Sequence, residues 1–214
     1  MVHYKLHYFD LYGRAEPIRM MFHLAEQTFE DRRFSFAEWP EIKKNETPSL
    51  FLFGQGPILE VDDKKIAQSL AIYRFVANTF GFTGFAGNSL MDRAQMDMIV
   101  DYYTDYLTKI ADWYVVKAGY KPGDEEELRK TLLDPNRKIF FENLQGFIEK
   151  EGTGYIVGDK VSYADLTLLN HIDIFTRNYD EYLHGYPVMQ DYVSRLRNLP
   201  LLREYLAERP DRPR

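Results

Sequence analysis

Residues 56–69 read GPILEVDDKKIAQS, and this stretch decides the fold of the first part of the chain. Ile58–Val61 and Lys65-Ile66 are short runs of strand type, and the Asp62-Asp63 turn joins them as an antiparallel pair. Ser69 then opens a helical pattern. The stretch therefore predicts two paired strands followed directly by a helix.

Upstream of this stretch, strand and helix patterns alternate. Strand-like runs at Tyr4–Tyr8 and Phe29–Phe34 flank a helical pattern over about residues 14–26, whose apolar positions form one stripe. A strand, a helix and a second strand in this order imply a parallel pair with a right-handed crossover. Residues 1–80 are therefore predicted to form a small α/β domain.

The strand patterns disappear near residue 86, and long helical patterns follow. A capping-box pattern at Ser89–Asp92 starts the first of them. A second helical pattern, over residues 124–150, contains Pro135, which is expected to break or bend it. Residues 86–214 are therefore predicted to form an all-helical domain.

A second capping box lies at Ser162-Tyr163-Ala164-Asp165. The Ser162 hydroxyl can accept from the amide of Asp165, while the Asp165 carboxylate can accept from the amide of Ser162. We interpret this box as the start of a core helix that serves folding. Replacing Asp165 by Ala is expected to cost about 1 kcal/mol, the usual contribution of such a cap.

Composition limits the classes of function. A chain of 214 residues with 45% hydrophobic content can bury a sizeable core, and its net charge of −6 argues against a nucleic-acid partner. No run approaches the roughly 20 apolar residues of a membrane span, and the start lacks a signal-peptide pattern. A cytoplasmic location is therefore the expectation. The histidines lack metal-binding spacing, so no metal site is expected.

Three features near the start of the chain are suited to a peptide that carries a thiol. Tyr8 ends the first strand, where its phenol can approach a ligand thiol. Gly56-Pro57 offers backbone for a peptide to pair with, and Ser69 opens a helix whose first N–H groups can hold a carboxylate. The chain contains no cysteine, so any sulfur chemistry needs a thiol brought by the ligand.

Six stretches follow one another from one end of the chain to the other: Tyr8-Phe9, GRAE at 13–16, WPEIK at 39–43, PILEV at 57–61, QSLAI at 68–72 and SYADL at 162–166. In this order the chain resembles the cytosolic glutathione transferases of the sigma class, which includes many invertebrate and helminth enzymes and the haematopoietic prostaglandin D synthase. The resemblance implies a detoxifying transferase with glutathione as co-substrate and no prosthetic group. It also implies a thioredoxin-like glutathione-binding domain over residues 1–80 and an all-helical domain with the electrophile site over residues 86–214.

Tyr8 is the predicted catalytic residue, with Arg14 as its electrostatic support. A thiol with a pKa near 8.5 is only slightly ionised at neutral pH, and the thiolate is the nucleophile. A phenol that donates to the sulfur, with a guanidinium nearby, lowers this pKa. The alternative interpretation of Tyr8 is a tyrosine that only fills an interface. The other residues predicted to bind glutathione are Trp39, Lys43, Gly54, Gln55, Gly56, Pro57, which the resemblance implies to be cis, Gln68, Ser69 and Asp105 of the partner subunit.

The resemblance further implies a two-fold homodimer, in which Asp105 of the partner subunit approaches the γ-glutamyl amine; Asp101 is the alternative. The electrophile is predicted to meet an apolar lining, which suits hydrophobic electrophiles in general. Its members are Phe9, Tyr12, Gly13, Tyr106, Ile110 and Trp113. Aromatic residues at helical spacing are equally typical of a plain core.

Two features depart from the sigma pattern. Gly56 stands where relatives carry a branched apolar residue, so a looser loop is expected before Pro57. The stretch 44–53 is longer than in relatives and contains the apolar run Leu50–Phe53, which either packs on the domain or alters access to the glycyl end of glutathione.

Two other functions stay open beside conjugation and a narrower prostaglandin-H D-isomerase activity. One is a ligandin-type carrier of haem or lipids with low turnover, and the other is a structural protein of the lens-crystallin kind. Tyr8, Arg14, Gln68 and Ser69 together favour the enzyme, because a carrier needs the apolar pocket but not a phenol that activates a thiol.

Overall fold

The computed structural model describes residues 2–212, apart from the side chain of Phe82. The chain divides into two compact units. The first combines the described parts of Met1–Ala86 and Leu199–Arg214, and the second is Gly87–Asn198.

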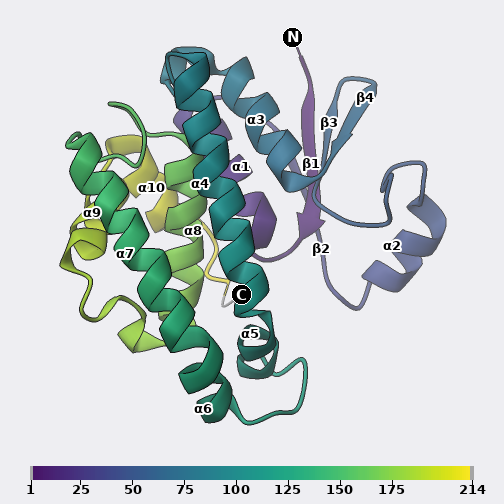
Figure 1. The fold of residues 1–214 in the computed structure, drawn as a ribbon. Helices are drawn as coiled ribbons and strands as arrows, with labels where there is room; N and C mark the ends of the chain where they lie inside the picture. The colour runs from purple at the N-terminus through teal and green to yellow at the C-terminus, as the bar shows by residue number, and fades with distance from the viewer. Residues whose placement is uncertain (1, 213–214) are drawn as a thin grey trace. The chain divides into compact units, whose positions relative to one another are not determined.

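The first unit has the α/β architecture that the sequence predicts, with a mixed sheet in the order β2-β1-β3-β4 (Figure 1). β1 runs parallel to β2 and antiparallel to β3, and β3 pairs with β4 in the predicted hairpin. The elements of this unit are β1 (Tyr4–Phe9), the 3-10 turn η1 (Gly13–Ala15), α1 (Glu16–Leu24), β2 (Glu30–Phe34), α2 (Trp39–Glu46), β3 (Ile58–Val61), β4 (Lys64–Ala67), α3 (Ser69–Thr79), the 3-10 turn η2 (Gly81–Thr83) and α10 (Pro200–Glu208).

β1 is covered on both faces, because successive side chains of a strand point in opposite directions. On one face the Tyr4 ring contacts Phe22 of α1 at 5.2 Å between ring centroids. On the other face His7 contacts Phe51 at 6.4 Å, beside α2. β1, which runs one residue past the predicted end at Tyr8 to Phe9, is therefore packed from both sides.

The division into units differs from the predicted domains at Ala86, which belongs to the first unit, and at the C-terminal segment. Residues 199–214 were predicted to belong to the helical domain. In the structure the described part of this segment belongs to the first unit, where α10 packs against α1. Residue 1 of the predicted first domain and residues 213–214 of the predicted second lie outside the described residues.

The long stretch after α2 packs on the first unit through Phe51, with the half-buried Leu50 beside it. Phe51 is fully buried, and its ring contacts those of Phe34 and Trp39 at 5.7 and 4.9 Å. Leu52 and Phe53 are exposed, Phe53 by 65%. The apolar run Leu50–Phe53 had two alternatives, packing on the domain or altering access to the glycyl end. Phe51 packs on the domain.

In the second unit every described element of secondary structure is a helix, as predicted, and loops join these helices (Figure 1). Its elements are α4 (Leu90–Lys109), α5 (Ala111–Lys117), α6 (Glu125–Leu128), η3 (Arg129–Leu133), α7 (Asp134–Glu151), α8 (Tyr163–Asn178), η4 (Asp180–Leu183) and α9 (Pro187–Arg197). The helical path continues through Pro135 because η3 is a π-helical turn directly before it. Proline lacks the N–H that the α-helical ladder requires, and a wider turn accommodates that loss.

α8 is the central helix of this unit and packs against α4 and α9. Every residue from Tyr163 to Phe175 is buried, which is typical of a helix enclosed on all sides. Its capping box forms as predicted between Ser162 and Asp165, and the box at Ser89 and Asp92 forms at the start of α4.

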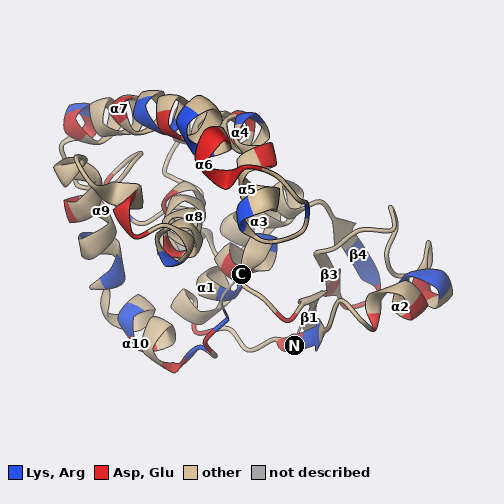
Figure 2. Cartoon of the chain, turned by 90° about the horizontal axis from the view of Figure 1, so that it is seen from below, with Lys and Arg blue, Asp and Glu red and all other residues tan. Residues whose placement is uncertain are grey.

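Acidic and basic side chains are interspersed over the helices, with an acidic stretch at α6 (Figure 2). Glu125, Glu126 and Glu127 all lie in the first turn of α6, where negative charge is favourable to the helix dipole. Among the described residues, no helix has the length and apolar character needed to cross a membrane.

Candidate functional site

The sheet register brings three predicted site residues to one end of the sheet. His7 lies opposite Ile58, and Ile58 lies opposite Ala67. One residue further along each strand come Tyr8 in β1, Pro57 before β3 and Gln68 after β4. Hydrogen-bonded strands lie about 4.8 Å apart, so this end of the sheet can present all three to one small ligand.

The Tyr8 side chain is 8% exposed and faces the η1 turn. The backbone N–H of Arg14 donates to the Tyr8 hydroxyl oxygen at 3.3 Å. The Arg14 side chain is exposed, and its role as electrostatic support for the thiolate stays a prediction. The Arg14 carbonyl accepts from the Tyr73 hydroxyl at 2.7 Å, which anchors the turn to α3.

Gly13 has no side chain because the Tyr8 hydroxyl occupies the space. A Cβ atom at Gly13 would lie 2.8 Å from the Tyr8 oxygen and 2.4 Å from Leu11 Cδ1. The backbone φ of +43° is also one that favours glycine. The turn therefore approaches the phenol as closely as a backbone can.

Gly13→Ala is expected to lower kcat/KM for conjugation about tenfold, because the added methyl group displaces the Tyr8 hydroxyl. The strained φ is expected to lower the free energy of unfolding by about 2 kcal/mol. Kinetics and urea unfolding measure both effects. The control is Gly146→Ala in α7, where a Cβ meets nothing within 4 Å and helix propensity favours the variant. If Gly13→Ala is as active and stable as Gly146→Ala, the prediction is contradicted.

The loop before β3 lies against both Tyr8 and α2. The Gly56–Pro57 peptide bond is cis, as the resemblance implies, and a Cβ at Gly56 would lie 3.2 Å from the Tyr8 ring. Gly54 lies against Lys43, whose Cε would be 3.1 Å from a Cβ there. Gln55 between them is exposed. The 54–57 loop thus borders Lys43 at Gly54 and the Tyr8 ring at Gly56.

Trp39 and Lys43 both lie on α2 and are close to each other. The Lys43 Nζ is 6.0 Å from the centre of the Trp39 ring and the lysine is exposed. The Trp39 ring stacks on Phe34 at 5.5 Å, so this part of α2 is fixed to the sheet. An exposed ammonium on a fixed helix can hold a carboxylate as a point charge.

The first turn of α3 follows β4 at the same end of the sheet. Gln68 precedes the helix with a φ of +71°, and Ser69 is its first residue. The Ser69 side chain is buried, while Gln68 is exposed. The N–H groups of such a first turn lack helical partners and point toward an approaching anion.

Phe9 and Tyr12 have partners within the first unit that account for their burial. The Phe9 ring contacts those of Phe34, Phe36 and Trp39 at 4.9, 4.6 and 5.3 Å. The Tyr12 hydroxyl donates to the Pro210 carbonyl at 3.0 Å. Their predicted role in an electrophile lining stays a prediction.

Tyr106, Ile110 and Trp113 are buried in the core of the helical unit. The Tyr106 ring stacks on Phe140 at 4.1 Å, and its hydroxyl lies 2.7 Å from that of Tyr182. Trp113 contacts Phe175 at 5.9 Å. The plain-core interpretation, which the sequence left open for aromatic residues at helical spacing, describes these contacts better than a pocket lining.

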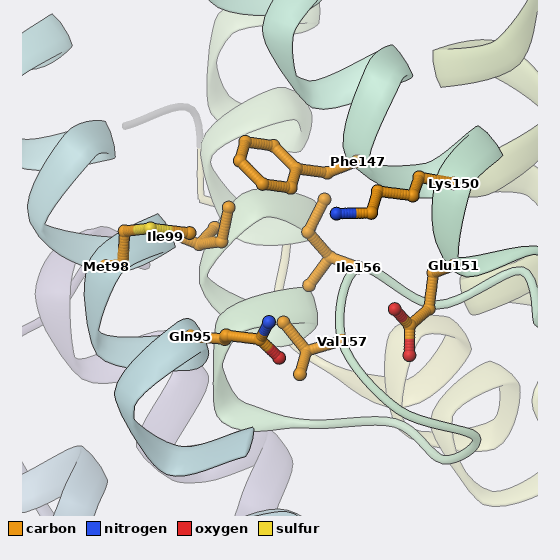
Figure 3. A pocket seen from close by; sticks show the side chains of 8 residues that line it. All are labelled: Gln95, Met98, Ile99, Phe147, Lys150, Glu151, Ile156 and Val157. Atoms are coloured by element: carbon orange, nitrogen blue, oxygen red, sulfur yellow. The ribbon is translucent and has the colours of Figure 1, made fainter. Parts of the chain in front are cut away.

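Asp105 and Asp101 lie on α4 and are both exposed. No group of candidate metal ligands occurs among the described residues. A cavity of about 60 Å³ lies in the helical unit, lined from α4, α7 and the segment 156–157 (Figure 3). It has room for a few water molecules and is too small for a tripeptide.

Sequence reasoning missed two contributors to the Tyr8 environment. Tyr73 lies four residues after Ser69, one helical turn along α3, and this spacing was a usable signal. Glu16 was quoted only as part of the GRAE stretch. It is fully buried and held by Tyr205 and Arg209, which no local pattern could reveal.

Comparison with known proteins places this geometry in a family. The N-terminal domain model of glutathione S-transferases matches residues 4–78, and a C-terminal domain model of the same family matches residues 104–209. A thioredoxin-like domain followed by a helical domain is the architecture of this class of protein. The chain belongs to the glutathione S-transferase family.

Individual relatives agree over the whole length. Glutathione S-transferase 1 of Ascaris suum is 37% identical, with 100% of both chains covered. The structure of a Nu-class transferase from Haemonchus contortus is 37% identical, with a TM-score of 0.89 and 100% of both chains covered. That of a monomeric transferase, Na-GST-3 of Necator americanus, is 41% identical, with a TM-score of 0.89 and 98% of both chains covered.

Proposed function

We propose that this protein conjugates the thiol of glutathione to hydrophobic electrophiles, with Tyr8 stabilising the thiolate. The observation that carries the proposal is the Tyr8 hydroxyl, which accepts the Arg14 amide at 3.3 Å at the sheet end shared with Pro57 and Gln68. A phenol whose oxygen accepts one hydrogen bond still has a proton to donate. Donation of that proton to sulfur is the proposed catalytic contact.

The proposed contact is matched to the energy that the reaction requires. Lowering a thiol pKa by about two units corresponds to about 2.7 kcal/mol of differential stabilisation. A hydrogen bond to a charged group contributes roughly 1.5 to 3 kcal/mol. One phenol hydrogen bond, polarised by the Arg14 amide, is therefore of the right size.

The remaining groups of the sheet end are proposed to bind the rest of glutathione. The first turn of α3, with Ser69 and Gln68, holds the γ-glutamyl carboxylate. The backbone of Gly56 pairs with the cysteinyl portion, next to the Tyr8 ring that Gly56 already borders. Lys43, with Trp39 beside it, meets the glycyl carboxylate.

The electrophile is proposed to approach the thiolate beside Gly13. Of the six residues predicted to line its site, Gly13 is the one that borders the Tyr8 oxygen. It carries no side chain that would come between that oxygen and a substrate. Hydrophobic electrophiles are the proposed class, and we do not assign the aromatic residues of the helical core to their binding.

Three finer assignments belong to the same proposal. The first is the sigma type, which rests on the six stretches that begin with Tyr8-Phe9. One of the similar structures is of the Nu class instead. The second is a cytoplasmic, detoxifying enzyme. The third is a homodimer in which Asp105 of the partner subunit reaches the γ-glutamyl amine; exposure of Asp105 on α4 is compatible with it. Sedimentation at the assay concentration tests the dimer, and a monomer with full activity contradicts the role of Asp105.

The test of the function is conjugation of glutathione to chlorodinitrobenzene, with the bound thiolate titrated by its ultraviolet absorbance. We expect turnover and a thiolate that forms near neutral pH. Glutathione binding without thiolate near neutral pH contradicts the proposal and favours a carrier of hydrophobic ligands.

A further inference from the structure

The segment that follows α10 lies along the loop that joins β1 to α1. The backbone N–H of Arg212 donates to the Tyr12 hydroxyl at 3.3 Å, and that hydroxyl donates to the Pro210 carbonyl. The Arg212 Nε donates to Asp10 at 2.9 Å. Residues about 200 positions apart in sequence are thus joined within the first unit.

Arg209 makes the central contacts of this segment. Its guanidinium carbon lies 4.3 Å from the centre of the Tyr12 ring, and its Nη1 donates to the Glu16 carboxylate at 2.9 Å. The Arg209 side chain is 7% exposed and that of Glu16 is 1% exposed. Charge-assisted bonds and cation–π contacts are strongest when water is excluded in this way.

These two contacts lie on either side of the η1 turn. Tyr12 directly precedes the turn and Glu16 directly follows it. Within the turn, the Arg14 amide donates to the Tyr8 hydroxyl, and a Cβ atom at Gly13 would lie 2.8 Å from the same hydroxyl oxygen. A shift of Tyr12 or Glu16 therefore changes the distance between that amide and the phenol.

We infer that Arg209 is a positioning residue for the Tyr8 hydroxyl: it holds both ends of the η1 turn so that the Arg14 amide stays directed at the phenol. The inference rests on the proposed function, because Tyr8 must be the group that stabilises the thiolate. It adds a residue from the far end of the chain to the determinants of thiol activation.

Glu16 keeps other partners when Arg209 is removed. Arg19 donates to its second carboxylate oxygen at 3.2 Å, and Tyr205 donates to the first at 2.9 Å. The buried carboxylate is therefore not left without donors, and Arg209→Ala is expected to fold. What the variant loses is the link between Glu16 and Tyr12.

The test compares Arg209→Ala and Arg209→Lys with Arg203→Ala as the matched control. Arg203 lies on α10, six residues before Arg209, is exposed and is absent from these contacts. The readouts are the titration of bound glutathione by its ultraviolet absorbance, kcat and KM for glutathione, and thermal unfolding.

For Arg209→Ala we expect the pKa of the bound thiol to rise by about one unit, a tenfold loss of acidity, with kcat reduced accordingly. KM for glutathione is expected to stay unchanged, because no residue that binds the tripeptide is removed. Arg209→Lys keeps the charge beside Glu16 but not the planar contact with Tyr12. Its bound-thiol pKa is expected to lie between those of the wild type and Arg209→Ala. Arg203→Ala is expected to titrate like the wild type.

A folded Arg209→Ala that titrates bound thiol like the wild type overturns the inference, as does a loss of thermal stability alone. If Arg209→Ala does not fold, Arg209→Lys decides by the same readout. Tyr8→Phe separates this result from the proposed function. If Tyr8→Phe titrates like the wild type, the role of Tyr8 fails and the inference fails with it; if Tyr8→Phe loses the thiolate and Arg209→Ala does not, only the inference fails.

Discussion

Tyr8→Phe is expected to lower kcat/KM for conjugation about a hundredfold while glutathione still binds, because one preorganised donor to a developing or bound anion contributes that much. The ring should keep its place, since it contacts Phe9 at 5.5 Å and lies against Gly56. Only the hydroxyl is lost. The measurement is steady-state conjugation together with titration of the bound thiol, whose pKa should move upward.

Tyr4→Phe is the matched control for this prediction. Tyr4 lies on β1 at an even spacing from Tyr8, so both side chains point to the same face. Its ring is buried against Phe22 and Phe80, far along the strand from the η1 turn. Tyr4→Phe should leave the thiol titration unchanged. A Tyr8→Phe variant that still forms thiolate near neutral pH excludes Tyr8 as the stabilising group.

Asp165→Ala is expected to lower the free energy of unfolding by about 3 to 5 kcal/mol, the cost of removing one partner from a buried charged network. The carboxylate is fully buried and accepts from both the amide and the hydroxyl of Ser162, from the Ile156 amide at 2.9 Å and from the Tyr192 hydroxyl at 2.8 Å. Burial raises the pKa of this carboxyl. Alanine leaves donors of the loop, α8 and α9 without an acceptor.

Asp92→Ala supplies the comparison, because Asp92 holds the same position in the capping box of α4. That box is exposed, and the Ser89 hydroxyl keeps the pKa of Asp92 below its ordinary value. Its loss should cost about 1 kcal/mol. Urea unfolding followed by circular dichroism measures both variants. Equal losses at the two positions would show that burial adds nothing to the Asp165 box.

Local chemistry made several features of the fold predictable. The hairpin of β3 and β4, the crossover through α1 and both capping boxes depend on residues close together in sequence, and all of them form. Pro135 was recognised as incompatible with a regular helix for the same reason. The cost expected for losing Asp165 rises from about 1 to about 3 to 5 kcal/mol once the structure adds the contacts with Ile156 and Tyr192, which the local pattern could not reveal.

For the candidate site, too, the sequence predicted some residues from local patterns and left others undecided. Tyr8 was proposed from its place near the end of the first strand, while Pro57 and Gln68 were proposed from the loop before the hairpin and the helix start after it; only the sheet register brings the three to one end. The electrophile lining stays a prediction, since an aromatic residue at helical spacing has the same pattern whether it faces a pocket or a core. Tyr106 and Trp113 face the core, packed on Phe140 and Phe175.

By itself the sequence determined that the chain has an α/β part and a helical part, and that Tyr8 lies near the end of the first strand. Backbone conformation and side-chain periodicity are properties of neighbouring residues, so a local pattern is sufficient for both. Only the tertiary structure revealed that the Arg14 amide donates to the Tyr8 hydroxyl. It alone also placed Arg209 between Tyr12 and Glu16. Such contacts join residues nearly 200 positions apart, and they exist only because the packing of α10 on α1 brings the two segments together.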